Sequence, residues 1–131
     1  MATVPLRSDE TAAPEARAVF DDIRATRGTD YVNNFWRALA HDPALLGATW
    51  DRVKAVMGPG ALDPLVKEMV YIAVSAANGC SYCAHSHTAS AKAKGMTPAM
   101  HGELLAVIGL AMQTNGLANA LQVEVDDAFR A

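Results

Sequence analysis

Two cysteines and two histidines lie within eight consecutive residues of this 131-residue chain. If a helix begins near Cys80, a rotation of about 100° per residue places Cys80, Cys83 and His87 within an arc of roughly 60°, and His85 on another side. A cysteine in the first turn of a helix meets free backbone N–H groups and the positive end of the helix dipole, which both favour the thiolate. The spacing therefore predicts a reactive dithiol, with a histidine one turn further on that can carry a proton.

The spacing also discriminates among the chemistries that a dithiol can support. A c-type haem needs a histidine directly after the second cysteine, where Ala84 stands, and a thioredoxin-type centre needs a βαβ context that this sequence lacks. Zinc stays open, with the two cysteines and His87 as ligands and Glu68, His85 or water as the fourth, although structural zinc usually takes two separated ligand pairs. We therefore expect a two-cysteine redox centre without metal or cofactor, in which one thiol attacks an oxidant and the other closes a disulfide.

A carboxylate lies one predicted helix upstream of the cysteines. Glu68 shares a stripe with Tyr71, Ser75 and Asn78 on a segment that is otherwise almost wholly apolar. Periodicity alone predicts that this polar stripe faces solvent. The alternative is that the next helix doubles back over the stripe, so that Glu68 becomes a buried general base beside the thiols.

The remaining sequence predicts the helices that position these residues. Alanine, leucine, methionine and lysine are frequent, and apolar runs of period two are absent. Asp42-Pro43, Asp63-Pro64 and Thr97-Pro98 each resemble an N-cap followed by the first helical residue. Helices are expected at residues 14–27, 31–40, 43–57, 64–78, 80–95, 98–114 and 117–129, with Asn115-Gly116 separating the last two. We predict an all-α bundle of five to six or more helices that forms a single domain over residues 1–131.

Composition excludes several classes of protein. Hydrophobic residues make up 51% and charged residues 19%, which is too apolar for a disordered chain. Eleven basic and fourteen acidic residues give a net charge of −3 without a basic cluster, so we expect neither a nucleic-acid nor a membrane partner. We see no secretory signal and no apolar run near the ~20 residues of a membrane span, and expect a soluble cytoplasmic protein. Its surplus of apolar helix surface predicts a homo-oligomer.

The spacing Glu68-x11-Cys80-x2-Cys83-x3-His87 is similar to the E-x11-C-x2-C-x3-H core of the AhpD-like alkylhydroperoxidases, within the carboxymuconolactone decarboxylase-like superfamily. Residues 78–88 resemble its peroxidase-related branch. The close match covers residues 62–109, and a weaker one surrounds residues 33–43. The resemblance implies an all-α fold that forms homotrimers or homohexamers, with the site close to a subunit interface.

The resemblance also implies a role for each residue. Cys83 corresponds to the sulfur that attacks hydrogen peroxide or an organic hydroperoxide, Cys80 resolves it into a disulfide, and Glu68 and His87 relay protons. Tyr82 stands where the prototype has a relay histidine, and a phenol is a poorer proton shuttle at neutral pH. The function implied is antioxidant defence, with a dithiol reductant that in the best-understood members is a lipoyl group on another protein. Two alternatives stay open: a metal-binding or redox-sensing module, and a non-redox acid–base enzyme of the superfamily.

Overall fold

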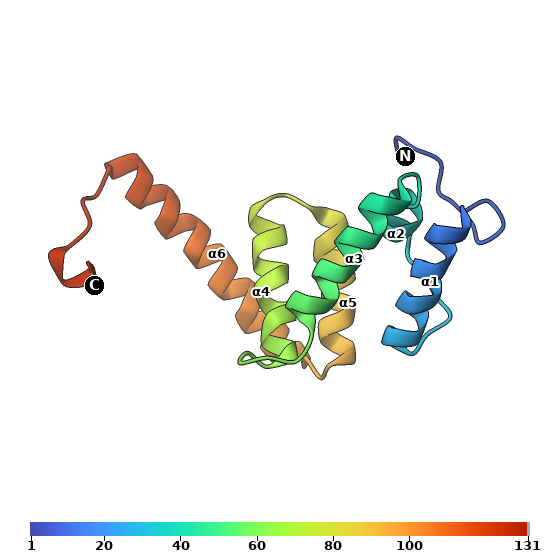
Figure 1. The fold of residues 1–131 in the computed structure, drawn as a ribbon. Helices are drawn as coiled ribbons and strands as arrows, with labels where there is room; N and C mark the ends of the chain where they lie inside the picture. Colours follow the sequence, from blue (N-terminus) through green and yellow to red (C-terminus); the bar gives the residue numbers. More distant parts are fainter. Residues whose placement is uncertain (131) are drawn as a thin grey trace. The chain divides into compact units, whose positions relative to one another are not determined.

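A computed structural model describes residues 1–130, and this part of the chain contains six α-helices, one 3-10 turn and no strand (Figure 1). The elements are α1 (Pro14–Arg27), α2 (Asn34–Leu39), α3 (Pro43–Met57), α4 (Pro64–Ala77), α5 (Ser81–Ala93), α6 (Pro98–Leu121) and η1 (Asp127–Phe129). The all-α prediction is confirmed. The helices form two compact units, Met1–Gly58 and the chain from Pro59 onward, which are described separately. The single domain over residues 1–131 stays a prediction.

The first unit packs α1, α2 and α3 around an aromatic and aliphatic core. Phe20, Ile23 and Leu46 are fully buried, and the rings of Trp36 and Trp50 meet edge to face with their centroids 5.3 Å apart. Such an aromatic pair is worth about 1 kcal/mol beyond the area that it buries. Both tryptophans therefore pack in the core of this unit.

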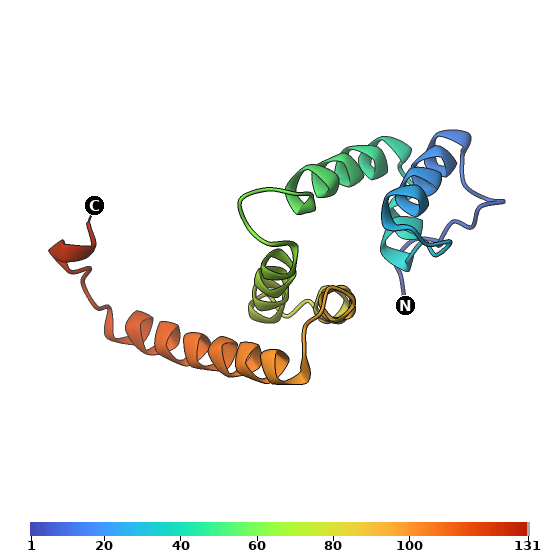
Figure 2. The same ribbon diagram turned by 90° about the horizontal axis from the view of Figure 1, so that it is seen from below.

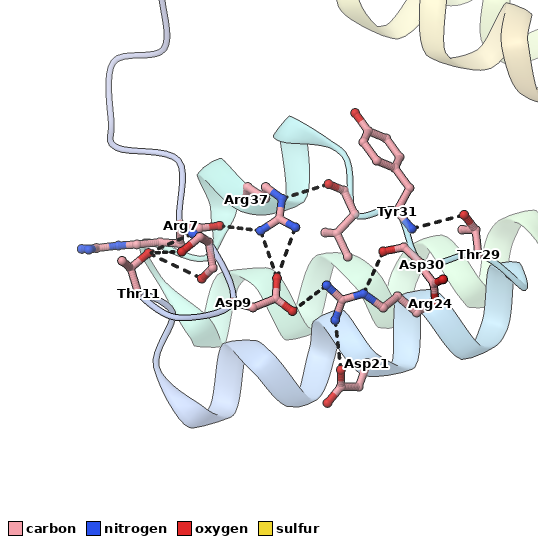
Figure 3. Close-up of polar contacts among 11 residues, drawn as sticks. Arg7, Asp9, Thr11, Asp21, Arg24, Thr29, Asp30, Tyr31 and Arg37 are labelled. Atoms are coloured by element: carbon pink, nitrogen blue, oxygen red, sulfur yellow. Dashed lines mark hydrogen bonds and ion pairs between the residues drawn. The ribbon is translucent and has the colours of Figure 1, made fainter.

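The carboxylate of Asp9 binds the segment before α1 to this unit. Asp9 accepts hydrogen bonds from Arg24 at 2.6 Å and from Arg37 at 3.2 Å, and Arg24 also donates to Asp21 on its own helix (Figure 3). Burial by itself raises the pKa of Asp9, but the two guanidinium groups outweigh it and lower that pKa. The cluster is therefore an ion-pair network that joins the N-terminal segment to α1 and α2.

The second unit is built on a helical hairpin. Figures 1 and 2 show α4 and α5 running side by side, and the short connection between them turns at Gly79, which has a φ of +68°. A side chain is strained at that φ, so glycine suits this sharp reversal. A small core lies between these helices and the start of α6. It consists of the buried residues Ile72, Ala91 and Met96, of which Ala91 is fully buried. The first half of α6 covers this small core with Met100, Leu104 and Ile108.

The last helix corrects three expectations. α6 continues through Asn115 and Gly116 to Leu121, because a glycine inside a helix costs only about 1 kcal/mol and does not by itself stop it. The separate helix expected at 117–129 is wrong, since residues 117–121 belong to α6 and only Asp127–Phe129 form a turn. α6 is also long and apolar enough to cross a membrane by length and composition, which no expected helix was. Only 6% of that stretch is buried.

The polar stripe of α4 is buried in part. Glu68 and Ser75 are 5% and 4% exposed, whereas Tyr71 is 38% exposed and Asn78 is also exposed. Val66, Val70 and Val74, spaced one turn apart, are instead 42–53% exposed. The prediction that this stripe faces solvent is therefore wrong for Glu68 and Ser75. The hairpin buries Glu68, because α5 supplies the polar partners that the carboxylate needs.

Candidate active site

The hairpin opposes two stripes of polar side chains. Residues three or four apart share a helix face, and five such residues line the face of α5 beginning at its N-cap. They are Cys80, Cys83, His87, Ser90 and Lys94. Because α5 returns along α4, the last turns of α5 lie beside Glu68 near the start of α4. At the other end, the Cys80 N–H donates to the Ser75 carbonyl at 2.9 Å. The site is therefore built from a single helical hairpin.

The two cysteines share one end of this site as reduced thiols. Cys80 is the N-cap of α5, and its Sγ accepts the backbone N–H of Cys83 at 3.4 Å. The Cys83 thiol also donates to the Cys80 sulfur, which lowers the pKa of Cys80 and raises the pKa of Cys83 to about 11. When the pair loses one proton, the negative charge lies on Cys80 and the remaining proton on Cys83. Both side chains are partly exposed, so a small oxidant can reach them.

Glu68 lies at the opposite end, where three donors from α5 surround it. Its Oε2 lies 2.6 Å from Nδ1 of His87, and its Oε1 accepts from Oγ of Ser90 at 2.8 Å and from Nζ of Lys94 at 2.9 Å. Burial by itself raises the pKa of this carboxyl. The hydrogen bonds from His87, Lys94 and Ser90, with the charge of Lys94, outweigh burial and lower that pKa to about 2. Glu68 is therefore an anion at every physiological pH.

The state of Glu68 fixes the orientation of His87. An ionised carboxylate can only accept, so Nδ1 of His87 carries the hydrogen and Nε2 of the neutral ring keeps a free lone pair. The imidazole is also stacked on Tyr71, with ring centroids 3.6 Å apart and planes 19° apart. Burial and then the charges of Cys83, Cys80 and Glu68 raise the pKa of Tyr71. The phenol therefore lies in the field of both the dithiol and the carboxylate, and its ring contacts His87.

The predicted site residues fall into two groups. The structure brings Glu68 to His87 through a direct contact and Cys80 to Cys83 through another. Tyr82, in the first turn of α5, is 43% exposed. Among residues 1–130, no group of three histidine, cysteine or acidic side chains is arranged to hold a metal ion.

Sequence reasoning missed two residues of the site and undervalued a third. Ser90 and Lys94 follow His87 by three and seven positions, which is the spacing of one helix face and was the available signal. For Tyr71, solvent exposure was favoured over a role in the site. Its side chain is 38% exposed, and its ring stacks on His87.

Comparison with known proteins identifies the family to which this helical fold belongs. The model of the carboxymuconolactone decarboxylase family matches residues 43–124, and the chain belongs to that family. A crystal structure of the alkylhydroperoxidase AhpD core from Rhodospirillum rubrum superposes with a TM-score of 0.97 at 66% identity. That match covers 100% of this chain and 98% of the other. The AhpD-like resemblance is thereby confirmed.

A curated relative shows the same likeness over a shorter stretch. The alkyl hydroperoxide reductase AhpD of Solibacter usitatus is 41% identical over 64 residues, which is 49% of this chain. The match spans 34% of that relative, or about a third of its length.

Proposed function

We propose that the chain is a thiol-dependent peroxidase that reduces hydrogen peroxide or organic hydroperoxides through a cycle between dithiol and disulfide. The observation that carries this proposal is the pair formed by Cys80 and Cys83, two partly exposed thiols that share a hydrogen bond at the start of α5. Such a pair holds both sulfurs needed to reduce one peroxide. The AhpD names of the two similar proteins support the same activity.

The first step breaks the O–O bond of the peroxide. The proton held on Cys83 passes to Cys80, and the Cys83 thiolate attacks one peroxide oxygen to give a sulfenic acid on Cys83. The other oxygen leaves as an alkoxide or hydroxide and takes up a proton, which forms an alcohol or water. The dithiol at net charge −1 contains the one proton that this leaving group needs. The sulfur is oxidised by two electrons, and the peroxide is reduced by two.

The second step closes the disulfide. The Cys80 thiolate attacks the sulfur of the Cys83 sulfenic acid, the S–S bond forms, and hydroxide leaves and is protonated to water. A dithiol reductant then exchanges with the disulfide, is itself oxidised to a disulfide, and restores both thiols. A dihydrolipoyl group on another protein has the chemistry for this exchange.

Proton transfer is assigned to the Glu68–His87 pair. Glu68 holds His87 as the Nδ1–H tautomer, so Nε2 can take up a proton from solvent and donate it to the hydroxide that leaves as the disulfide forms. The proposed division of labour resembles that of a carboxylate which orients a catalytic imidazole without itself becoming protonated. Tyr82 is proposed as a further relay group, with its side chain at the start of α5.

Single cysteine variants test the roles of the two thiols. Cys80→Ser is expected to consume one equivalent of peroxide and to accumulate a sulfenic acid that dimedone traps on Cys83. Cys83→Ser is expected to consume none at the same peroxide excess. Peroxide consumption by Cys83→Ser together with its loss in Cys80→Ser would reverse the assigned roles.

The same proposal includes a homo-oligomer, a trimer or a hexamer, in the cytoplasm. Its support is the apolar surface that the chain leaves exposed on α4 and α6. The residues are Val66, Val70 and Val74 on α4, and Leu105, Val107, Leu110, Met112 and Leu117 on α6. An apolar surface of this extent is typical of a protein interface.

A second candidate is a non-redox acid–base enzyme, favoured by one observation. The Glu68–His87 pair is assembled by α4 and α5 without any hydrogen bond from the thiols to the carboxylate among its described contacts. Such a pair could move protons on a small lactone or keto acid. Turnover of such a substrate after both thiols are blocked would support this candidate. No turnover would count against the acid–base enzyme and in favour of the peroxidase.

A further inference from the structure

The last two turns of α5, beyond His87, contribute two more polar side chains to the site. Ser90 and Lys94 lie on the same face as His87 and reach the same carboxylate. They also bond to each other, since Nζ of Lys94 donates to Oγ of Ser90 at 2.8 Å. Neither residue belongs to the motif of glutamate, two cysteines and histidine.

We propose that Lys94 and Ser90 are positioning residues that hold Oε1 of Glu68, so that Oε2 is reserved for Nδ1 of His87 and the imidazole keeps Nε2 free as the proton acceptor. The two carboxylate oxygens are divided between distinct partners at 2.6, 2.8 and 2.9 Å. Three donors from three successive turns of one helix cannot exchange partners without rotating the carboxylate. A rotation would cost two hydrogen bonds at a group that is only 5% exposed.

The position of Lys94 suits it to this task. It is the C-cap of α5, where a cation is favoured by the negative end of the helix dipole, and its side chain is 39% exposed. Its ammonium therefore supplies a positive charge to the buried carboxylate without being fully buried itself. Lys92, two residues earlier, is exposed on the same helix and provides a matched comparison.

The charges around Glu68 define what loss of Lys94 does. From α5, Glu68 faces His87 and Lys94, and on its own helix Tyr71 lies within reach of its charge. α6 contributes apolar side chains to the neighbouring core. Without Lys94, burial is opposed by fewer donors and the carboxyl protonates at higher pH. With fewer donors on Oε1, the carboxylate can also rotate away from Nδ1, and the neutral ring of His87 then populates the Nε2–H tautomer as well, which is unable to accept at Nε2.

The test compares Lys94→Met with Lys94→Arg and Lys92→Met. The tautomer of His87 is measured from the ring nitrogen signals in ¹H–¹⁵N spectra between pH 4.5 and 8, with His87→Gln used for assignment. Wild type, Lys94→Arg and Lys92→Met are expected to keep the Nδ1–H tautomer of the neutral ring, while the neutral ring of Lys94→Met also populates the Nε2–H form. An Nδ1–H tautomer in Lys94→Met at every pH where the ring is neutral would overturn the inference. If Lys94→Met does not fold, Ser90→Ala carries the same comparison.

The inference rests on the proposed peroxidase function for its effect on rate, and the two can fail separately. Lys94→Met is expected to slow peroxide-driven loss of thiols at least about tenfold, and Lys94→Arg to restore most of that rate. If wild type does not react with peroxide, the peroxidase function fails and the tautomer spectra still decide the role of Lys94. If wild type reacts and Lys94→Met reacts equally fast, the positioning role is overturned and the peroxidase stands.

Discussion

Replacing Glu68 by glutamine removes the charge on which the polar half of the site depends. The pKa of Glu68 is lowered from 4.5 to about 2 in the folded protein, a shift of about 2.5 pH units. At 1.36 kcal/mol per unit, the ionised carboxylate stabilises the fold by about 3 kcal/mol. Its side chain is only 6% exposed, so solvent screening removes little of this value. Glu68→Gln is isosteric and permanently neutral, and it is expected to lose most of that stabilisation.

The pH dependence follows from the direction of the shift. A carboxyl whose pKa is lowered on folding stabilises the protein fully above the unfolded value of about 4.5, and this contribution disappears as the pH falls towards about 2. Wild type and Glu68→Gln should therefore differ by about 3 kcal/mol at pH 6 and by about 1 kcal/mol or less at pH 2.5. The lowered pKa values of Asp9 and Asp22 affect both proteins alike and cancel in the difference.

Urea denaturation at fixed protein concentration, followed by circular dichroism from pH 6 to pH 2.5, measures this difference in the free energy of unfolding. Peroxide reactivity plays no part in the assay, so it examines the geometry of the site and not its chemistry. A difference that stays constant over the whole pH range would refute the assignment of a buried, ionised Glu68. A Glu68→Gln protein as stable as wild type at pH 6 would refute it equally.

Other predictions concern the thiols, the stacked ring and the exposed helix face. Iodoacetamide at pH 8 should label Cys80 at least about tenfold faster than Cys83, because the pKa of Cys80 is lowered and that of Cys83 is about 11; equal labelling seen by peptide mass spectrometry would contradict the shared proton. Tyr71→Phe should retain most of the peroxide reaction rate and Tyr71→Ala should lose about tenfold, because the stacking on His87 needs a ring; equal rates would remove Tyr71 from the site. Val70→Asp should lower the mass of the proposed oligomer in light-scattering chromatography, because Val70 is 53% exposed at the centre of an apolar face; an oligomer of unchanged mass would show that this face of α4 is not part of the interface.

Helix starts were predictable because their signals are local. Asp42 and Asp63 each accept hydrogen bonds from the first turn of their helix, and Thr97 does the same for α6. A short polar side chain before proline satisfies free N–H groups wherever the rest of the chain goes. The predicted helix break at Asn115-Gly116 was wrong, because these two residues disfavour a helix only weakly. The residues on either side favour the helix, so α6 continues through them.

The site was predictable only in part, because its burial depends on how two helices meet. Helical spacing placed Cys80, Cys83 and His87 on one face of α5 correctly. It could not decide which side of α4 faces α5, and it therefore left Glu68 in solvent. That outcome is set by Lys94 and Ser90, which provide the donors that make a buried carboxylate tolerable. The exposed valine face of α4 follows from the same choice.

The most direct measurement is a titration of the reduced protein with hydrogen peroxide and with an alkyl hydroperoxide, in which free thiols are counted and the mass of the intact chain is determined. The proposed cycle predicts that one equivalent of peroxide removes both thiols, that the mass falls by about 2 Da per chain as the disulfide forms, and that dihydrolipoamide restores both thiols. Thiols that survive a modest excess of both peroxides, with the mass unchanged, would contradict the peroxidase function. That result would favour the second candidate, a non-redox acid–base enzyme.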